Sequence, residues 1–64
     1  MLLNGKEFEL KEEKTLSDFL RENNYAPVYI AVEINGEIIP KANFDKTFLK
    51  NTDQIEIVRF VGGG

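Results

Sequence analysis

The chain has 64 residues, none of them cysteine or histidine, and 42% are hydrophobic. Without thiol and imidazole side chains, zinc modules, iron–sulfur and heme proteins, and hydrolases built on a Ser-His or Cys-His pair are disfavoured. Eight basic and eleven acidic residues give a formal charge of −3, which argues against a nucleic-acid or anionic-membrane partner. No apolar run approaches the roughly 20 residues of a spanning helix, and we expect a soluble cytoplasmic protein without a signal peptide.

The first predicted element is a β-hairpin over Met1 to Leu10. Asn4-Gly5 favours a type I′ turn, because both central residues of that turn need a positive φ. After the turn, apolar Phe8 and Leu10 alternate with charged residues. This is the two-residue period of a half-buried strand.

A short helix is predicted from Thr15 to Asn23-Asn24. Thr15 and Asp18 resemble a capping box, and asparagine tolerates the left-handed conformation that often ends a helix. The apolar residues have the i, i+3, i+4 spacing of one helical face, namely Leu16, Phe19 and Leu20. A helix of roughly nine residues is marginal in water by itself, so we expect it to pack on a sheet.

The middle of the chain predicts a second hairpin. Residues 25–27 are interpreted as a connector that ends in proline, which cannot sit inside a sheet. Val28 to Ile34 is a run of β-forming residues and predicts a central strand. Asn35-Gly36 supplies the turn, and Glu37 to Ile39 is a short return strand that Pro40 ends.

Residues 41–50 show weak periodicity, and we expect a loop or a short helical turn there. Its apolar residues are predicted to plug the core: Phe44, Phe48 and Leu49. Residues 51–53 predict a turn, and Gln54 to Val61 predicts the last strand. Its alternation places Ile55 and Ile57 on one face, and three residues on the other: Glu56, Val58 and Phe60.

This order of hairpin, helix, hairpin, loop and strand predicts an α+β fold of the ubiquitin-like β-grasp type. In that fold the last strand lies beside the first, and a mixed sheet of four to five strands packs on one main helix. A ferredoxin-like fold would need a second helix, which residues 41–50 do not favour. We predict a β-grasp domain over residues 1–61 and a flexible C-terminal glycine tail over residues 62–64.

Catalytic motifs are not evident in the sequence. The carboxylates are scattered, and neither the Gly-x-Gly-x-x-Gly nor the P-loop pattern occurs. We interpret Tyr25 and Tyr29 as packed amphipathic residues. We therefore expect no metal site, no cofactor bound by this chain, and no enzymatic activity of the chain alone.

The sequence ends with Gly62, Gly63 and Gly64, directly after a hydrophobic strand. A frayed end or a cloning remnant can also be glycine-rich, although a tag commonly brings histidines or a protease site. Glycine has no Cβ, so such a tail can enter a channel too narrow for side chains. An ATP-dependent partner can convert a terminal carboxylate into an acyl-adenylate, which sulfur and nitrogen nucleophiles attack. The chain would then be a co-substrate of other enzymes.

The chain resembles the ubiquitin-like sulfur carriers of the MoaD/ThiS type. Residues 31–40 (AVEINGEIIP) and 55–64 (IEIVRFVGGG) together are similar to the thiamine-biosynthesis sulfur carriers, the ThiS family. The resemblance spans nearly the whole chain. One departure is Phe44, where the family commonly has tryptophan, and we interpret this as a packing substitution.

The resemblance implies a sequence of partner reactions. A ThiF-type adenylyltransferase uses ATP and magnesium to adenylate the Gly64 carboxylate. A persulfide sulfur from a cysteine desulfurase route displaces AMP and leaves a Gly64 thiocarboxylate. A thiazole synthase of the ThiG type then takes the sulfur to build the thiazole phosphate of thiamine. We expect the free carrier to be a monomer.

The partner surface is predicted close to the tail, at Val58, Phe60 and Val61, because an apolar patch beside a tail favours docking. An equal alternative is that Phe60 caps the end of the core. We interpret Arg59 as an ordinary surface charge.

Three other functions remain open at the level of sequence. The first is the small subunit of molybdopterin synthase, which uses the same thiocarboxylate chemistry. The second is a ubiquitin-like modifier that forms an isopeptide bond with lysine. The third is a β-grasp binding module with an inert tail.

Overall fold

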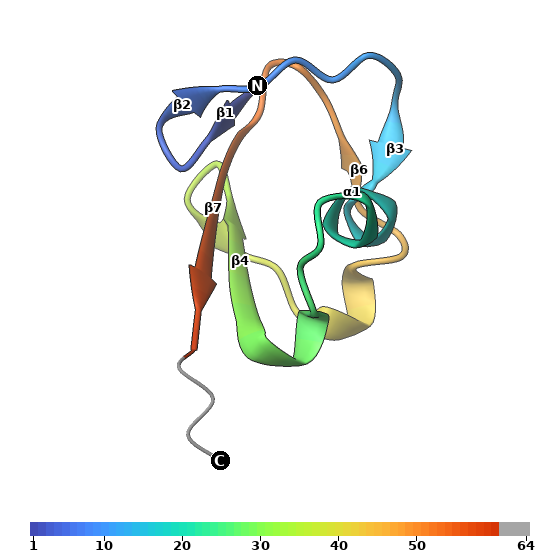
Figure 1. The fold of residues 1–64 in the computed structure, drawn as a ribbon, viewed down its shortest axis with the longest axis vertical. Helices are drawn as coiled ribbons and strands as arrows, with labels where there is room; N and C mark the ends of the chain where they lie inside the picture. Colours follow the sequence, from blue (N-terminus) through green and yellow to red (C-terminus); the bar gives the residue numbers. More distant parts are fainter. Residues whose placement is uncertain (61–64) are drawn as a thin grey trace.

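A mixed sheet runs through the protein in the strand order β2-β1-β7-β4-β5 (Figure 1). The computed structural model describes residues 1–60. The strands of this sheet are β1 (Leu2–Leu3), β2 (Lys6–Glu7), β4 (Ile30–Ile34), β5 (Glu37–Ile38) and β7 (Gln54–Arg59). β1 and β7 run parallel, and the other neighbouring strands run antiparallel. The first and last strands therefore lie side by side, and the sheet with its one α-helix confirms the β-grasp prediction for the described residues.

Both predicted hairpin turns have the backbone that their sequences favour. Asn4 and Gly5 have φ values of 51° and 83°, and Asn35 and Gly36 have values of 51° and 86°. A positive φ at two successive residues is what the type I′ turn requires. The two Asn-Gly pairs thus fix where the chain reverses.

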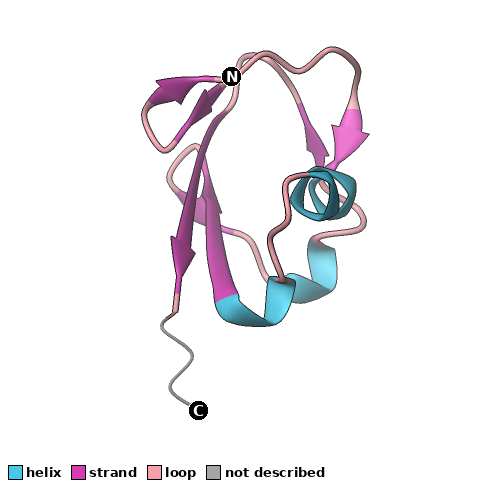
Figure 2. Cartoon of the chain, in the orientation of Figure 1, coloured by secondary structure: helices cyan, strands magenta, loops and turns pink. Residues whose placement is uncertain are grey.

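The helix α1 (Leu16–Glu22) lies on one side of the sheet (Figure 2). It begins as predicted, since the Thr15 hydroxyl accepts a hydrogen bond of 3.1 Å from the Asp18 backbone N–H. Asn23 caps its C-terminal end, and Asn24 follows with a φ of 64°. The helix has seven residues rather than the nine expected, and its three predicted apolar residues are fully buried: Leu16, Phe19 and Leu20.

The N-terminal hairpin is shorter than predicted. β2 ends at Glu7, and Leu10 is buried without belonging to a strand. The side-chain amide of Asn51 bonds the Leu10 backbone in place of a strand neighbour: the Leu10 N–H donates to Oδ1 at 2.9 Å, and Nδ2 donates to the Leu10 carbonyl at 3.0 Å. A distant side chain therefore holds a segment that the alternation assigned to a strand.

A second, two-stranded sheet pairs β3 (Lys14–Thr15) with β6 (Phe48–Leu49) and was not predicted. It corrects one predicted core residue, because Phe48 is 54% exposed. Successive residues of a strand point to opposite faces, so burying Leu49 turns Phe48 outward. The other two predicted plugs, Phe44 and Leu49, are buried.

Lys14 connects this small sheet to the end of α1. Its ammonium donates a hydrogen bond of 2.5 Å to the Glu22 carboxylate. That hydrogen bond raises the pKa of Lys14 above its ordinary value, against the opposing effect of desolvation. The ion pair thus joins β3 to the last residue of α1, between two residues that are eight positions apart in the chain.

Two short 3₁₀ helices change other predicted boundaries. The first covers Pro27–Tyr29, so the strand predicted from Val28 begins at Ile30 instead. Its turn is closed by the Tyr29 N–H, which donates to the Ala26 carbonyl at 3.0 Å. Tyr29 is 56% exposed, which contradicts its prediction as a packed residue.

The second 3₁₀ helix, Lys41–Asn43, confirms the short helical turn expected within residues 41–50. The strand β5 before it ends at Ile38, one residue earlier than predicted. Ile39 still donates a backbone hydrogen bond of 2.9 Å to the Val32 carbonyl, so the chain stays beside β4 up to Pro40.

The core lies between the sheet and α1 and contains twelve buried hydrophobic residues of the described chain: Met1, Leu10, Leu16, Phe19, Leu20, Ile30, Val32, Ile34, Phe44, Leu49, Ile55 and Ile57. Tyr25 packs against it partly buried, as predicted. Within residues 1–60, no helix is long and apolar enough to cross a membrane.

Candidate functional site

The strand β7 leads to the predicted reactive end of the chain. It is the middle strand of the sheet, paired with β4 from Ile34↔Ile55 to Ile30↔Arg59 and with β1 at Leu3↔Ile55. Its arrow in Figure 1 points away from the end of the molecule that carries the N-terminus. The predicted site residues Val61 and Gly62–Gly64, and the predicted domain boundary after residue 61, lie outside the described residues. The structure thus describes the support from which these residues extend.

The side chain of Asn4, the residue after β1, forms hydrogen bonds with the C-terminal half of β7. Its Oδ1 accepts a hydrogen bond of 2.8 Å from the Ile57 N–H, and its Nδ2 donates one of 3.3 Å to the Ile57 carbonyl. The amide side chain therefore bonds β7 as a further peptide group of β1 would. The sequence analysis assigned Asn4 only to the turn. The signal for its hydrogen bonds to β7 was that the first turn residue is asparagine, which has a side-chain amide, and not glycine.

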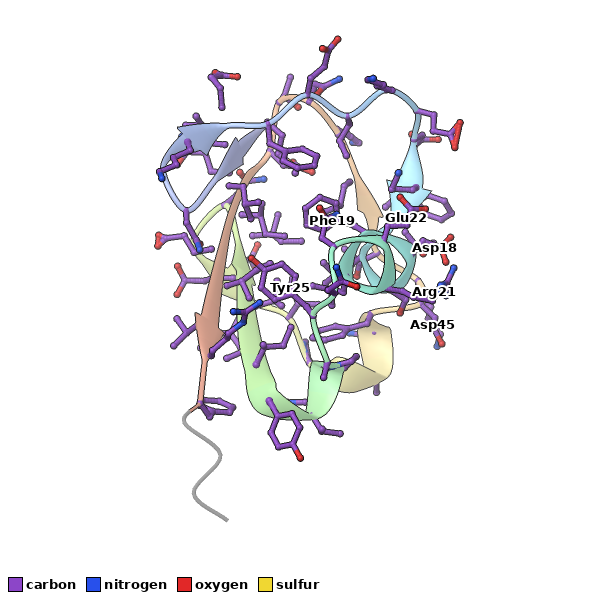
Figure 3. All side chains as sticks on the ribbon, in the orientation of Figure 1. Asp18, Phe19, Arg21, Glu22, Tyr25 and Asp45 are labelled. Atoms are coloured by element: carbon purple, nitrogen blue, oxygen red, sulfur yellow. The ribbon has the colours of Figure 1, made fainter. Side chains whose placement is uncertain are left out.

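Two contacts anchor the last described residues. The Phe60 N–H donates to the Tyr29 carbonyl at 2.8 Å, which continues the antiparallel pairing one step beyond Arg59. The Arg59 guanidinium lies 4.7 Å from the centroid of the Tyr25 ring, a cation–π distance. Tyr25 lies between α1 and the sheet, whereas Asp18, Arg21 and Asp45 lie on the outer side of α1 (Figure 3). Arg59 is thus exposed as predicted, and its guanidinium is engaged with an aromatic ring.

The two faces of β7 differ as the alternation predicts. Ile55 and Ile57 are buried against the core, while Val58 is 59% exposed and Phe60 is 51% exposed. Phe60 is thus about half exposed, and it is not among the buried core residues. Both residues are therefore accessible for the predicted partner contact, which stays a prediction.

Neighbouring strands extend the surface around Val58. Ala31 is opposite Val58 in the β4–β7 register, and Glu33 is opposite both Glu56 and Ile38. A shallow groove of about 260 Å³ lies over this surface. We call it the open sheet face and define it by five residues: Ala31, Glu33, Ile38, Glu56 and Val58.

The open sheet face was only partly predicted. Sequence reasoning singled out Val58 but treated the glutamates as scattered surface charges, because their proximity depends on the register between β4 and β7. Among residues 1–60 no group of three carboxylates is placed to hold a metal ion. The surface offers apolar contact and negative charge.

Comparison with known proteins gives consistent matches. The model of the ThiS family matches residues 1–64. The sulfur carrier protein ThiS of Bacillus subtilis is 41% identical over 63 residues, covering 97% of this chain and 96% of that protein. The thiazole synthase of Magnetococcus marinus is 36% identical over 62 residues, but the matched part is only 19% of that protein.

A solved structure agrees with the described fold. The crystal structure of the thiamine biosynthesis protein ThiS from Geobacter metallireducens superposes with a TM-score of 0.84 at 33% identity, covering 98% of this chain and 96% of that one. The family match, the relative covered over nearly its full length and the structural match point to the same family. The chain belongs to the ThiS family.

Proposed function

We propose that this protein is a sulfur carrier of thiamine biosynthesis that holds sulfur as a thiocarboxylate on Gly64. The observation that carries the proposal is the family match over residues 1–64, together with 41% identity to a named sulfur carrier over nearly the full length of both proteins. The protein is then a co-substrate: partner enzymes act on its terminus, and its fold presents that terminus to them.

The proposed chemistry has three steps. The Gly64 carboxylate attacks the α-phosphorus of ATP in a ThiF-type adenylyltransferase with magnesium, which releases pyrophosphate and forms an acyl-adenylate. A persulfide sulfur from a cysteine desulfurase route then attacks the carbonyl carbon, and AMP leaves. A thiol cleaves the resulting acyl disulfide, forming an ordinary disulfide and releasing the Gly64 thiocarboxylate.

The fold contributes presentation rather than catalysis. β7 is bonded on one side by β4 and on the other by β1 and Asn4, so the strand that precedes the proposed tail is held on both sides. Glycine residues carry no side chains that would block a narrow active-site channel. A thiocarboxylate held on such a support reaches the acceptor at a high effective concentration, unlike free sulfide.

The acceptor in this proposal is a thiazole synthase of the ThiG type. Support comes from the Magnetococcus protein of that name, in which a stretch similar to this chain forms part of a longer polypeptide. We place the reactions in the cytoplasm, because the activation step consumes ATP.

Removal of Gly64 tests the proposal. The shortened protein should fold with an unchanged melting temperature and should no longer support ATP–pyrophosphate exchange by the ThiF-type enzyme. The matched control is Phe48→Ser, which changes an exposed residue of β6 and should leave the exchange intact. Exchange at the wild-type rate without Gly64 would contradict the proposal and favour a binding module with an inert tail.

A further inference from the structure

Glycine directly follows asparagine in both hairpin turns, at Asn4-Gly5 and at Asn35-Gly36. In such a pair the glycine peptide nitrogen can attack the asparagine side-chain carbonyl carbon and close a cyclic imide, because no Cβ on the second residue hinders its approach. Both asparagines and both glycines are exposed. The two pairs therefore share the local chemistry of deamidation, and a difference between them comes from the fold.

The side chain of Asn35 is held at both ends of its amide by groups at the start of β7. Its Oδ1 accepts a hydrogen bond of 2.9 Å from the Gln54 N–H, and its Nδ2 donates one of 3.0 Å to the Asp53 carboxylate. The other oxygen of Asp53 accepts a hydrogen bond of 2.9 Å from the Lys50 N–H, which holds the carboxylate in place. The Asn35 amide thus lies between an N–H donor and a carboxylate.

These two groups meet the needs of ring closure. Attack by the Gly36 nitrogen places negative charge on Oδ1 of Asn35, and a positioned N–H stabilises such a charge. A proton must also reach Nδ2 before that nitrogen can leave as ammonia. A carboxyl group at about 2.6–3.2 Å can transfer a proton, and Asp53 lies at 3.0 Å from Nδ2. The turn at Asn35 therefore supplies both the oxyanion donor and the proton carrier.

The side chain of Asn4 has different neighbours within residues 1–60. Its Oδ1 accepts from the Ile57 N–H at 2.8 Å, but its Nδ2 donates to the Ile57 carbonyl at 3.3 Å. A peptide carbonyl does not carry a proton to a leaving nitrogen at neutral pH. The hydrogen bonds of Asn4 are also partly buried against the middle strand of the sheet, whereas those of Asn35 are exposed. Opening the side chain for attack therefore costs less free energy at Asn35.

We propose that Asn35 is a site of spontaneous deamidation and that Asp53 promotes the reaction. The Gly36 nitrogen forms a bond to Cγ of Asn35, and the Cγ–Nδ2 bond breaks. The proton that Gly36 loses is replaced at Nδ2 through solvent and the Asp53 carboxyl, so that ammonia leaves. Water then opens the cyclic imide at either carbonyl and produces aspartate or isoaspartate at position 35. The reaction involves this chain and water alone, so it does not depend on the proposed function.

The product destabilises the turn in which it forms. A carboxylate in place of the Asn35 amide has no donor for Asp53, and it places two negative charges at hydrogen-bond distance. The Asn35→Asp variant should therefore melt about 2–6 °C below wild type. Combining it with Asp53→Asn restores a donor and should recover most of this loss. An equal loss in both backgrounds would contradict a contact between the two charges.

The experiment incubates the purified wild-type protein in neutral buffer below its melting temperature and follows both turns by peptide mass spectrometry. Deamidation replaces one NH group by one oxygen atom, and fragmentation assigns the change to Asn4 or Asn35. In the folded protein Asn35 should react at least about tenfold faster than Asn4, a modest share of what a positioned acid or base supplies. In urea the two rates should agree within about twofold, since glycine follows both asparagines.

The variant Asp53→Asn tests the carboxylate itself. Its amide oxygen can still accept from Asn35 but does not pass on a proton, so deamidation of Asn35 should slow at least about fivefold while that of Asn4 stays unchanged. A carboxylate that only held the turn closed would have the opposite effect, because its replacement would loosen the turn and speed the reaction. The matched control is Asp45→Asn, which removes a carboxylate that Ser17 contacts and should change neither rate. Circular dichroism verifies that both variants are folded.

Three results would overturn the inference. The first is equal deamidation of Asn4 and Asn35 in the folded wild-type protein. The second is unchanged or faster deamidation of Asn35 in the Asp53→Asn variant. The third is modification of Asn35 in urea with none in the folded protein, which would show that the turn protects this residue.

Discussion

In this protein, asparagine side chains form hydrogen bonds with backbone groups that a neighbouring strand would otherwise form. Asn51 bonds both the N–H and the carbonyl of Leu10, and Asn4 does the same for Ile57. Asn35 accepts from the Gln54 N–H at 2.9 Å, beside the turn it helps to form. Such hydrogen bonds join residues far apart in the chain, so no local sequence pattern predicts them. The sequence showed these asparagines only as turn residues.

The Asn51 bridge predicts a clear stability effect. Asn51→Ala leaves the backbone of buried Leu10 without two hydrogen bonds, which should cost about 1–3 kcal/mol of unfolding free energy. Urea denaturation monitored by circular dichroism measures it. Asn43→Ala serves as the control, because the Asn43 side chain is exposed. A loss at Asn51 no larger than at Asn43 would show that the bridge does not hold the loop.

At the scale of elements, an element was predicted where a pattern repeats over several positions or where an Asn-Gly turn marks a hairpin, as it does for the two-residue strands β1, β2 and β5. α1 and β7 were found because their residues repeat a pattern over several positions. β3 and β6 have two residues each, which is too short for a period to be read. Their pairing, Thr15 with Phe48, spans 33 positions and set the outward direction of Phe48. The first 3₁₀ helix was missed because Val28 and Tyr29 are β-formers, and the turn after Pro27 overrode that preference.

The contact between α1 and the sheet supplies a second prediction. Phe19 is fully buried, and its ring meets Phe8 edge-on with centroids 5.2 Å apart. Phe19→Ala should cost about 3–5 kcal/mol, a large fraction of the stability of a domain this small. Arg21→Ala is the control, since its exposed pair with Asp18 should contribute less than about 1 kcal/mol. Similar denaturation midpoints for the two variants would contradict the described packing.

The link between β3 and α1 predicts a dependence on pH. The pKa of Lys14 is higher in the folded protein than its ordinary value of 10.5, because Glu22 accepts its hydrogen bond. The stabilisation is therefore complete below the ordinary pKa and is lost as the pH rises through the folded-state pKa. Lys14→Met should be less stable than wild type near neutral pH, and the difference should shrink above pH 10.5. A difference that is constant over this range would exclude the ion pair as its cause.

At the scale of the whole molecule, the topology places β7, the last strand, beside the N-terminal hairpin and directs the C-terminal end of β7 away from that hairpin. The β-grasp order followed from the sequence because hairpin turns and one amphipathic helix were all clearly marked. The candidate site was predicted less completely. Val58 and Phe60 could be found from alternation along one strand, whereas Glu33 and Ile38 join them only through the register of three strands.

The central claim is that the terminal carboxylate of this protein is exchanged for a thiocarboxylate. Intact-mass spectrometry after incubation with the ThiF-type enzyme, ATP, magnesium and a persulfide sulfur source with a reducing thiol tests it directly. The account predicts a mass gain equal to replacing one oxygen by one sulfur, located by fragmentation at Gly64 and absent without ATP. Either an unchanged mass with active enzyme or a lysine-linked adduct in place of the sulfur exchange would contradict it.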